Sequence, residues 1–338
     1  MMKQPETMKV TNEKRSSIFM AIVRKEFADY IRSWRIIILL AIIVLTCIGS
    51  LYTAVTTIQD VVDNQDAVAR SMASEQQLFL KMFTVSDGIL PPFVTFVTFL
   101  GPLLGIALGF DTINSERNNG TLMRMMAQPI PRDYVINAKF VAAILINTLL
   151  FFSLGFLVMA FGILFIGIPP TFEEFIRIIL YLVLCIVYIA FWLNLGILFS
   201  VRFKQAATSA LAGIAIWIFF SIFYSMIINV IAKSYLTSES ITTMEELISR
   251  QGFIAFLMRL SPNYLFSEST TILLTPHVRT TNPFGLTLEQ SAGSIVSPLP
   301  LDQSLMLIWP QLTGIIAATL ICFAVSYIMF MRQDIRTN

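Results

Sequence analysis

The residues that could bind a metal or act as nucleophiles are few in this chain. Its three cysteines, Cys47, Cys185 and Cys322, all fall inside long apolar runs, and its single histidine is His277. None of them has the short spacing that zinc ligands share, so we expect the cysteines to be small core side chains. The sequence therefore predicts no metal site and no cofactor held by this chain.

A site for nucleotide phosphates is also missing. The phosphate loop of ATPases needs a glycine followed by a lysine, because that lysine reaches the phosphates from the end of a glycine-rich turn. No glycine in this chain is followed by lysine. We therefore expect the chain to be no enzyme by itself and to hydrolyse no ATP.

One acidic pair, Glu173-Glu174, is followed by Arg177. The pattern resembles the Glu-Glu-x-x-x-Arg of membrane-embedded prenyl-protein proteases, but it is one residue short and no intramembrane histidine completes a site. We expect instead a solvated helix start, where acidic side chains are favourable. Asp111, Lys139 and Arg177 all stand at the ends of apolar runs. No span therefore carries the central charge typical of ion-coupled carriers.

The composition is typical of an integral membrane protein. Of its 338 residues, 56% are hydrophobic and only 13% are charged, whereas soluble domains carry about 25% charged residues. The mean hydropathy is +0.75. A formal net charge of +2 gives no reason to expect a nucleic-acid partner. We predict a multi-pass protein of a cell membrane, in contact with lipid.

Six apolar runs are long enough to cross a bilayer as helices, which takes about 20 residues. We place the spans at about 36–57, 93–112, 139–168, 176–200, 206–232 and 307–331. The expected fold is thus an all-α, six-helix transmembrane domain over 36–331, followed by a short tail at 332–338. The third run is long enough to tilt or bend.

Lysine and arginine set the expected orientation. With the N-terminus inside, the cytoplasmic segments hold sixteen of them and the external segments hold seven, spread over longer loops. Cytoplasmic loops carry this kind of excess. We therefore expect both termini in the cytoplasm and external loops at 58–92 and 233–306. Within the second loop, Phe253–Leu265 is apolar but too short to span, so we expect it to re-enter the membrane or lie on its outer surface.

The most ordered polar stretch lies between the second and third spans. There Gly120 opens a short helical pattern in which Leu122, Met125 and Met126 recur on one face. Pro129 ends that pattern, because proline lacks an N–H donor and disfavours helix in the residue before it. A short helix between two spans, with an apolar face, is suited to docking a soluble partner.

This segment, 113–138, resembles the coupling segment of ABC transporter permeases of the second membrane type, the ABC-2 family. The shared pattern is an acidic-basic pair, a Gly-Thr-Leu, an apolar run, a proline, a basic residue and a lysine that opens the next span. The matching residues here are Glu116, Arg117, Gly120, Thr121, Leu122, Met125, Met126, Ala127, Pro129, Arg132 and Lys139. The six-span layout and the basic tail are similar too, so the resemblance covers most of the chain. The chain departs from the pattern at 123–126, where many relatives carry leucines.

The resemblance implies a permease subunit, one half of a type V-like ABC exporter in a prokaryotic cell membrane. It implies two copies of an ATPase subunit, which would hold ATP and magnesium, and a second permease subunit, identical or related. The residues that it implies in ATPase coupling are Glu116, Arg117, Gly120, Thr121, Leu122, Arg124, Met125 and Met126. Substrates across relatives include antibiotics, peptides, lipids and ions, and no residue here is assigned to substrate binding. The alternative is a non-transporting sensor or scaffold that uses the ATPase to act on another membrane or envelope protein.

The region before the first span, 1–35, is predicted to be cytoplasmic and to end in an amphipathic elbow helix. From Ser16 to Arg35 the apolar positions share one helical arc that ends at Trp34. Such a helix lies in the membrane surface. Glu26 interrupts the arc, and two interpretations stay open: a carboxylate that is paired with a basic neighbour or turned to water, and a contact to the ATPase.

Small and polar residues inside the spans indicate helix packing. Gly101, Gly105 and Gly109 stand four apart in the second span, a spacing that lets two backbones approach closely. The contact could lie within this chain or between two subunits. Three asparagines inside the spans could join helices or line a cavity, namely Asn147, Asn194 and Asn229.

Overall fold

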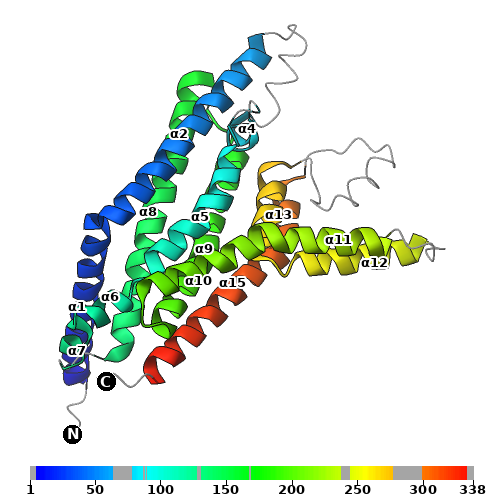
Figure 1. The fold of residues 1–338 in the computed structure, drawn as a ribbon. Helices are drawn as coiled ribbons and strands as arrows, with labels where there is room; N and C mark the ends of the chain where they lie inside the picture. Colours follow the sequence, from blue (N-terminus) through cyan, green and yellow to red (C-terminus); the bar gives the residue numbers. More distant parts are fainter. Residues whose placement is uncertain are drawn as a thin grey trace.

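The computed structural model describes residues 5–63, 78–86, 88, 90–127, 131–166, 169–236, 244–276 and 299–332; His277 and the tail beyond Arg332 lie outside this range. The described chain is helical throughout and contains no strand (Figure 1). Its elements are α1 (Pro5–Arg32), α2 (Trp34–Asp63), α4 (Leu78–Thr84), α5 (Phe93–Gly109), α6 (Asn114–Asn118), α7 (Thr121–Met126), α8 (Arg132–Ile166), α9 (Phe172–Arg202), α10 (Ala206–Ile218), the π-helix η1 (Phe219–Phe223), α11 (Tyr224–Leu236), α12 (Met244–Met258), α13 (Pro262–Leu274) and α15 (Leu301–Arg332).

Six helical stretches in the described residues are long and apolar enough to cross a membrane, which confirms the predicted number. They are Trp34–Ile58, Phe93–Asn118, Arg132–Phe165, Phe172–Arg202, Ala206–Tyr235 and Leu301–Arg332. The third and sixth begin earlier than the apolar runs from which they were predicted. A helix continues past its apolar run as long as its backbone hydrogen bonds are made, so polar first turns extend these two spans.

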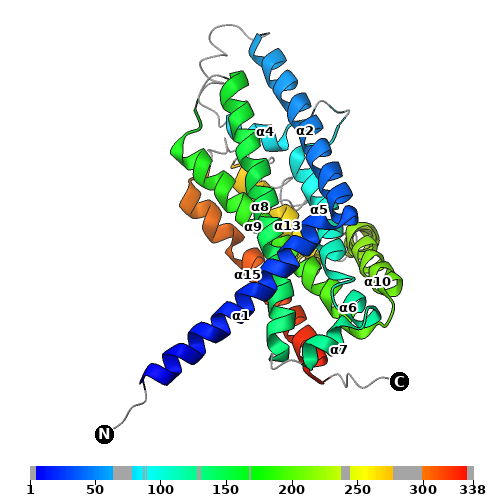
Figure 2. The same ribbon diagram turned by 90° about the vertical axis from the view of Figure 1, so that its left-hand side faces the viewer.

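Helix α9 is the centre of the bundle. It packs against α5, α8, α10, α13 and α15, and 72% of its most apolar window is buried, against 11% for the Ala206–Tyr235 span. In both Figure 1 and Figure 2, α9 lies between α8 and α15. The Phe93–Asn118 span is 50% buried, and the remaining four spans leave most of their apolar surface for lipid or for other chains.

The three spaced glycines lie where α5 packs on α9 within one chain. A Cβ atom added at Gly105 would lie 2.7 Å from the carbonyl oxygen of Ile189, and one at Gly109 would lie 2.5 Å from that of Leu193. At Gly101 the nearest atom, 3.1 Å away, belongs to the Ile189 side chain. The two backbones thus touch, and only glycine fits between them.

Two of the three span asparagines join helices. The amide nitrogen of Asn147 on α8 donates to the carbonyl oxygen of Ile186 on α9, and that of Asn194 on α9 donates to Thr319 on α15, both at 3.4 Å. Asn229 is exposed. The first two therefore hold the central helix to two of its neighbours.

The apolar stretch 253–265 forms the end of α12, a break, and the start of α13. Helix α13 packs against α9 and α15, so residues 262–265 enter the bundle, whereas residues 253–258 belong to α12. Helices α11 and α12 lie side by side and extend away from the bundle (Figure 1). They share a small core of their own, formed by Ile228, Ala232, Ile254 and Met258.

The prediction of a solvated helix start at Glu173-Glu174 was right about the helix start and wrong about Glu174. Helix α9 has both acidic residues in its first turn, and the Glu173 side chain is 45% exposed. Glu174 is buried in a capping box, and Arg177 is fully buried. The Arg177 guanidinium donates to the carbonyl oxygens of Leu273 at 3.0 Å and Leu299 at 2.6 Å. The last carbonyls of a helix have no partner within it, so an arginine from α9 satisfies the end of α13 and draws this helix start into the interior.

Candidate functional site

The segment between the second and third spans folds into two short helices, α6 and α7, which we call the α6–α7 hairpin. Gly120 joins them with φ at +67°, and a Cβ there would meet nothing within 4 Å. Backbone conformation and not space therefore favours glycine. The Thr121 hydroxyl donates to the Glu116 carbonyl oxygen at 3.2 Å, which closes the turn. The amides of Ile113 and Asn114 donate to the Ser200 hydroxyl at the end of α9.

The direction in which α7 faces differs from the sequence expectation. Leu122 is only 2% exposed and Met125 packs against the main core, so these two do not form a free docking face. The side chain of Met126 lies outside the described residues. Met123, 46% exposed, and Arg124 point outward instead. A six-residue helix tied at both ends to spans closes its apolar face on those spans.

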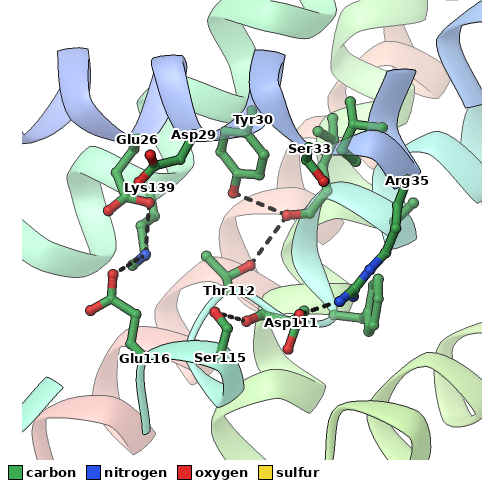
Figure 3. A pocket seen from close by; sticks show the side chains of 14 residues that line it. Glu26, Asp29, Tyr30, Ser33, Arg35, Asp111, Thr112, Ser115, Glu116 and Lys139 are labelled. Atoms are coloured by element: carbon green, nitrogen blue, oxygen red, sulfur yellow. Dashed lines mark hydrogen bonds and ion pairs between the residues drawn. The ribbon is translucent and has the colours of Figure 1, made fainter. Parts of the chain in front are cut away.

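Three buried charges tie the hairpin to the bundle. The Lys139 ammonium on α8 lies 2.7 Å from a carboxylate oxygen of Glu26 on α1 and 2.9 Å from one of Glu116 on α6 (Figure 3). The side chains are 4%, 7% and 7% exposed. Glu116, which the resemblance implied in ATPase coupling, therefore faces the interior. Removing one member of such a buried set leaves an uncompensated charge, which is strongly destabilising.

Lys25 completes what we call the junction cluster, Lys25, Glu26, Glu116 and Lys139. Its ammonium lies 3.0 Å from Glu26, 3.3 Å from Glu116 and 3.4 Å from Asp29. Burial alone would raise the pKa of Glu26, but Lys139 and Lys25 outweigh it and lower that pKa. Burial likewise opposes the charge on Lys25, yet Glu26, Glu116 and Asp29 raise its pKa above the ordinary value. Both groups are thus charged at neutral pH.

A second set of contacts joins the end of α1 and the start of α2 to the end of α5 and the residues that follow it. The Tyr30 hydroxyl donates to the Leu108 carbonyl oxygen at 3.0 Å, and Arg35 donates to the Asp111 carboxylate at 3.1 Å. Burial raises the pKa of Tyr30. Trp34, assigned from sequence to the elbow helix, instead begins α2 after a break at Ser33 and is 72% exposed.

These contacts surround a pocket of about 220 Å³ (Figure 3). Helices α1, α2 and α8 and the α5–α6 turn line it. Its charged lining residues are Glu26, Asp29, Arg35, Asp111, Glu116 and Lys139. The pocket therefore lies where the first helix, the α6–α7 hairpin and the ends of three spans meet.

Sequence reasoning identified Glu26 and Glu116 but did not bring them together. It treated Asp111 as a charge at a span end, Lys139 as that and as the lysine of the family pattern, and Arg35 as the end of the elbow region. The signal was present, because Glu26 interrupts an apolar arc and Lys139 stands seven residues inside α8. Opposite charges on apolar helix faces favour one another as partners.

A comparison with curated proteins found no match. A family comparison matches residues 20–335 to the family described as ABC-2 family transporter protein. The matched range includes the junction cluster, the α6–α7 hairpin and all six candidate spans. This chain therefore belongs to the ABC-2 family and is the membrane component of an ABC transporter, a family whose members work with an ATPase subunit.

Proposed function

We propose that the chain is the permease subunit of an ATP-driven exporter and that the α6–α7 hairpin receives the movement of the ATPase. The observation that carries this proposal is the buried bridge of Lys139 to Glu116 and Glu26. It joins the hairpin to α8 and to α1 by charged side chains that are only 4–7% exposed.

The hairpin has four routes into the bundle. It continues covalently from α5 and toward α8, its first amides are held by Ser200 of α9, and Glu116 is held by Lys139. Separating buried opposite charges costs several kcal/mol. A push on the hairpin therefore moves α1, α5, α8 and the end of α9 together rather than bending the loop.

The outward side of α7 is the proposed docking surface. Met123 would contribute about 1.5–3 kcal/mol if it became fully buried in a groove of the ATPase. Arg124 beside it adds an exposed charge, and exposed pairs contribute only about 0–1 kcal/mol. The partner surface that fits is an apolar groove with an acidic rim.

The decisive experiment is Met123→Asp, with Gln205→Asp on the exposed α9–α10 connection as its control. Because Met123 is exposed in this chain, the permease should still insert and fold. We expect Met123→Asp to abolish co-purification with the ATPase, since a carboxylate would be buried unpaired in the groove. If both variants bind the ATPase equally well and the two complexes hydrolyse ATP at the same rate, α7 is not the coupling element.

The wider assembly is part of the same proposal: two ATPase subunits, a second permease subunit, and both termini in the cytoplasm. The start of α1, the end of α15 and α7 lie at one end of the molecule in both views (Figures 1 and 2), which supports a shared side. Directional transport assays on the complex in vesicles would separate an exporter from a sensor or scaffold that only signals through the ATPase.

A further inference from the structure

We propose that α11 and α12 form an arm that swings as one body relative to the bundle, and that the ion pair of Arg259 with Glu268 latches it in the position described here. The arm consists of Tyr224–Leu236 and Met244–Met258. This proposal does not rest on the coupling role of the α6–α7 hairpin. It follows from the separate core of the arm, from two interruptions of regular helix at its base, and from the charged contact that crosses them.

The arm is held together by contacts of its own. Its small core is separate from the main core of the bundle. At the base, the Tyr224 hydroxyl on α11 donates to the Leu257 carbonyl oxygen on α12. Farther out, Arg250 on α12 donates to the carbonyl oxygen of Tyr235 on α11 at 2.8 Å and lies over its ring, 5.0 Å from the centroid. The two helices are thus tied to each other at two levels, so we expect them to move together.

The chain enters and leaves the arm through interruptions of regular α-helix. It enters through the π-helix η1, and helices bend at such turns. It leaves through the break between α12 and α13, where Ser261 is extended and Pro262 has no N–H to continue a helix. The Asn263 amide donates to the Ser221 hydroxyl and α13 packs against η1, so the two connections lie side by side. Together they form a hinge that allows rotation about the line joining them.

An ion pair crosses this hinge. Arg259 extends the last turn of α12, because its amide donates to the Ala255 carbonyl oxygen at 3.0 Å, and it therefore moves with the arm. Its guanidinium donates through Nε and through Nη2 to the two carboxylate oxygens of Glu268 on α13, at 3.0 Å each. Two parallel charged bonds of this kind are strong and fix the relative orientation of their partners. Tyr264 on α13 also packs against the arm core, but this apolar contact lies at the hinge itself, where rotation changes it little.

Glu268 belongs to the bundle. Its side chain is 2% exposed, and the Gln311 amide on α15 donates to it at 3.0 Å. The Arg259 side chain is 43% exposed, so it can leave without unpacking α13 or α15. If the arm swings away, Glu268 stays buried and loses its charged partner, which is costly. The ion pair therefore favours the arm position described here, and its loss should release the arm.

The test measures the position of the arm by double electron–electron resonance on the full chain in nanodiscs. The three native cysteines are changed to alanine, and spin labels are attached at Ser234→Cys on the arm and Ser153→Cys on α8, both exposed positions. Ser234 lies about 16 Å along the helix from η1, so a rotation of about 20° displaces it by about 6 Å. We expect a narrow distance distribution in this background and one that is shifted or broadened by about 6 Å in Arg259→Gln. Equal distributions would overturn the proposal.

Further variants separate release of the arm from damage to the fold. Arg259→Gln combined with Glu268→Gln leaves no lone buried carboxylate and should also release the arm, whereas Arg202→Gln, at an exposed arginine outside the hinge, should keep the distribution narrow. If the double variant stays narrow, or Arg202→Gln broadens the distribution equally, the ion pair is not the latch.

A second pair of labels tests whether the arm moves as one body. Labels at Ser225→Cys on α11 and Ser249→Cys on α12, both exposed, should keep the same distance distribution in Arg259→Gln as in the unlatched control Arg202→Gln. Broadening of this distribution in Arg259→Gln would show that the arm loosens internally, and it would refute a swing of the whole arm.

Discussion

Replacing Lys139 by methionine removes the central charge of the junction cluster and keeps most of the side-chain volume. Two pairs at about 4 Å between charge centres contribute about 4 kcal/mol each at an effective dielectric constant near 20, and desolvation offsets much of this. Removing one partner of a buried pair costs about 3–5 kcal/mol. Lys25 still reaches both carboxylates, so we expect the lower end, about 3 kcal/mol.

Thermal unfolding in nanodiscs measures this loss. At roughly 2 °C per kcal/mol for a chain of this size, Lys139→Met should lower Tm by about 6 °C. Lys204→Met, at an exposed lysine, is the control and should change Tm by less than about 1 °C. Adding Glu116→Gln to Lys139→Met should recover part of the loss, because a neutral amide is cheaper to bury than a lone carboxylate.

The reasoning is refuted by either of two results. A Lys139→Met protein as stable as the Lys204→Met control would show that the bridge adds nothing to the fold. A double variant that loses stability additively would show that Lys139 and Glu116 do not interact.

The remaining predictions concern pH, packing and orientation. Because the pKa of Glu26 is lowered from its ordinary 4.5, its contribution to the free energy of unfolding is present above pH 4.5 and disappears as the pH falls through the pKa of the folded state. Tm should therefore drop on acidification, and Glu26→Gln should make that drop smaller. An unchanged drop in Glu26→Gln would exclude Glu26 as the cause. Gly109→Ala should destabilise by about 1–3 kcal/mol through overpacking, whereas Gly252→Ala, with nothing within 4 Å, should not; equal unfolding free energies would contradict the α5–α9 contact. A membrane-impermeant thiol reagent applied outside cells should label Phe172→Cys and spare Asn118→Cys, both exposed positions, and the reverse pattern would invert the proposed orientation.

The six spans could be predicted because hydropathy over about 20 residues marks a bilayer crossing. The first residues of the spans could not be predicted, because hydropathy does not show how many polar turns a helix has before it enters the lipid. The start at Arg132 instead of 139 is of this kind. The break at Ser33, which moved Trp34 from one helix to the next, is a local backbone event without a proline or glycine to signal it.

The site was predicted in part. The spacing of Gly120, Leu122 and Met125 gave a short helix at the right place. This spacing could not show whether the apolar face of α7 packs against the spans or against a partner protein, because either contact requires the same pattern of apolar residues. Two partners of Arg177, the carbonyl oxygens of Leu273 and Leu299, were also beyond sequence reasoning, because every residue has a carbonyl oxygen.

Arg177, near the start of α9, holds the end of α13 beside the residues that precede α15. The described chain ends at Pro276 and resumes at Leu299, and the Leu299 amide donates to the Pro276 carbonyl oxygen at 2.9 Å. The Arg177 guanidinium binds both of these parts of the chain, because it donates to the carbonyl oxygens of Leu273 and Leu299. The end of α13 and the residues before α15 are therefore held together by contacts that do not involve residues 277–298.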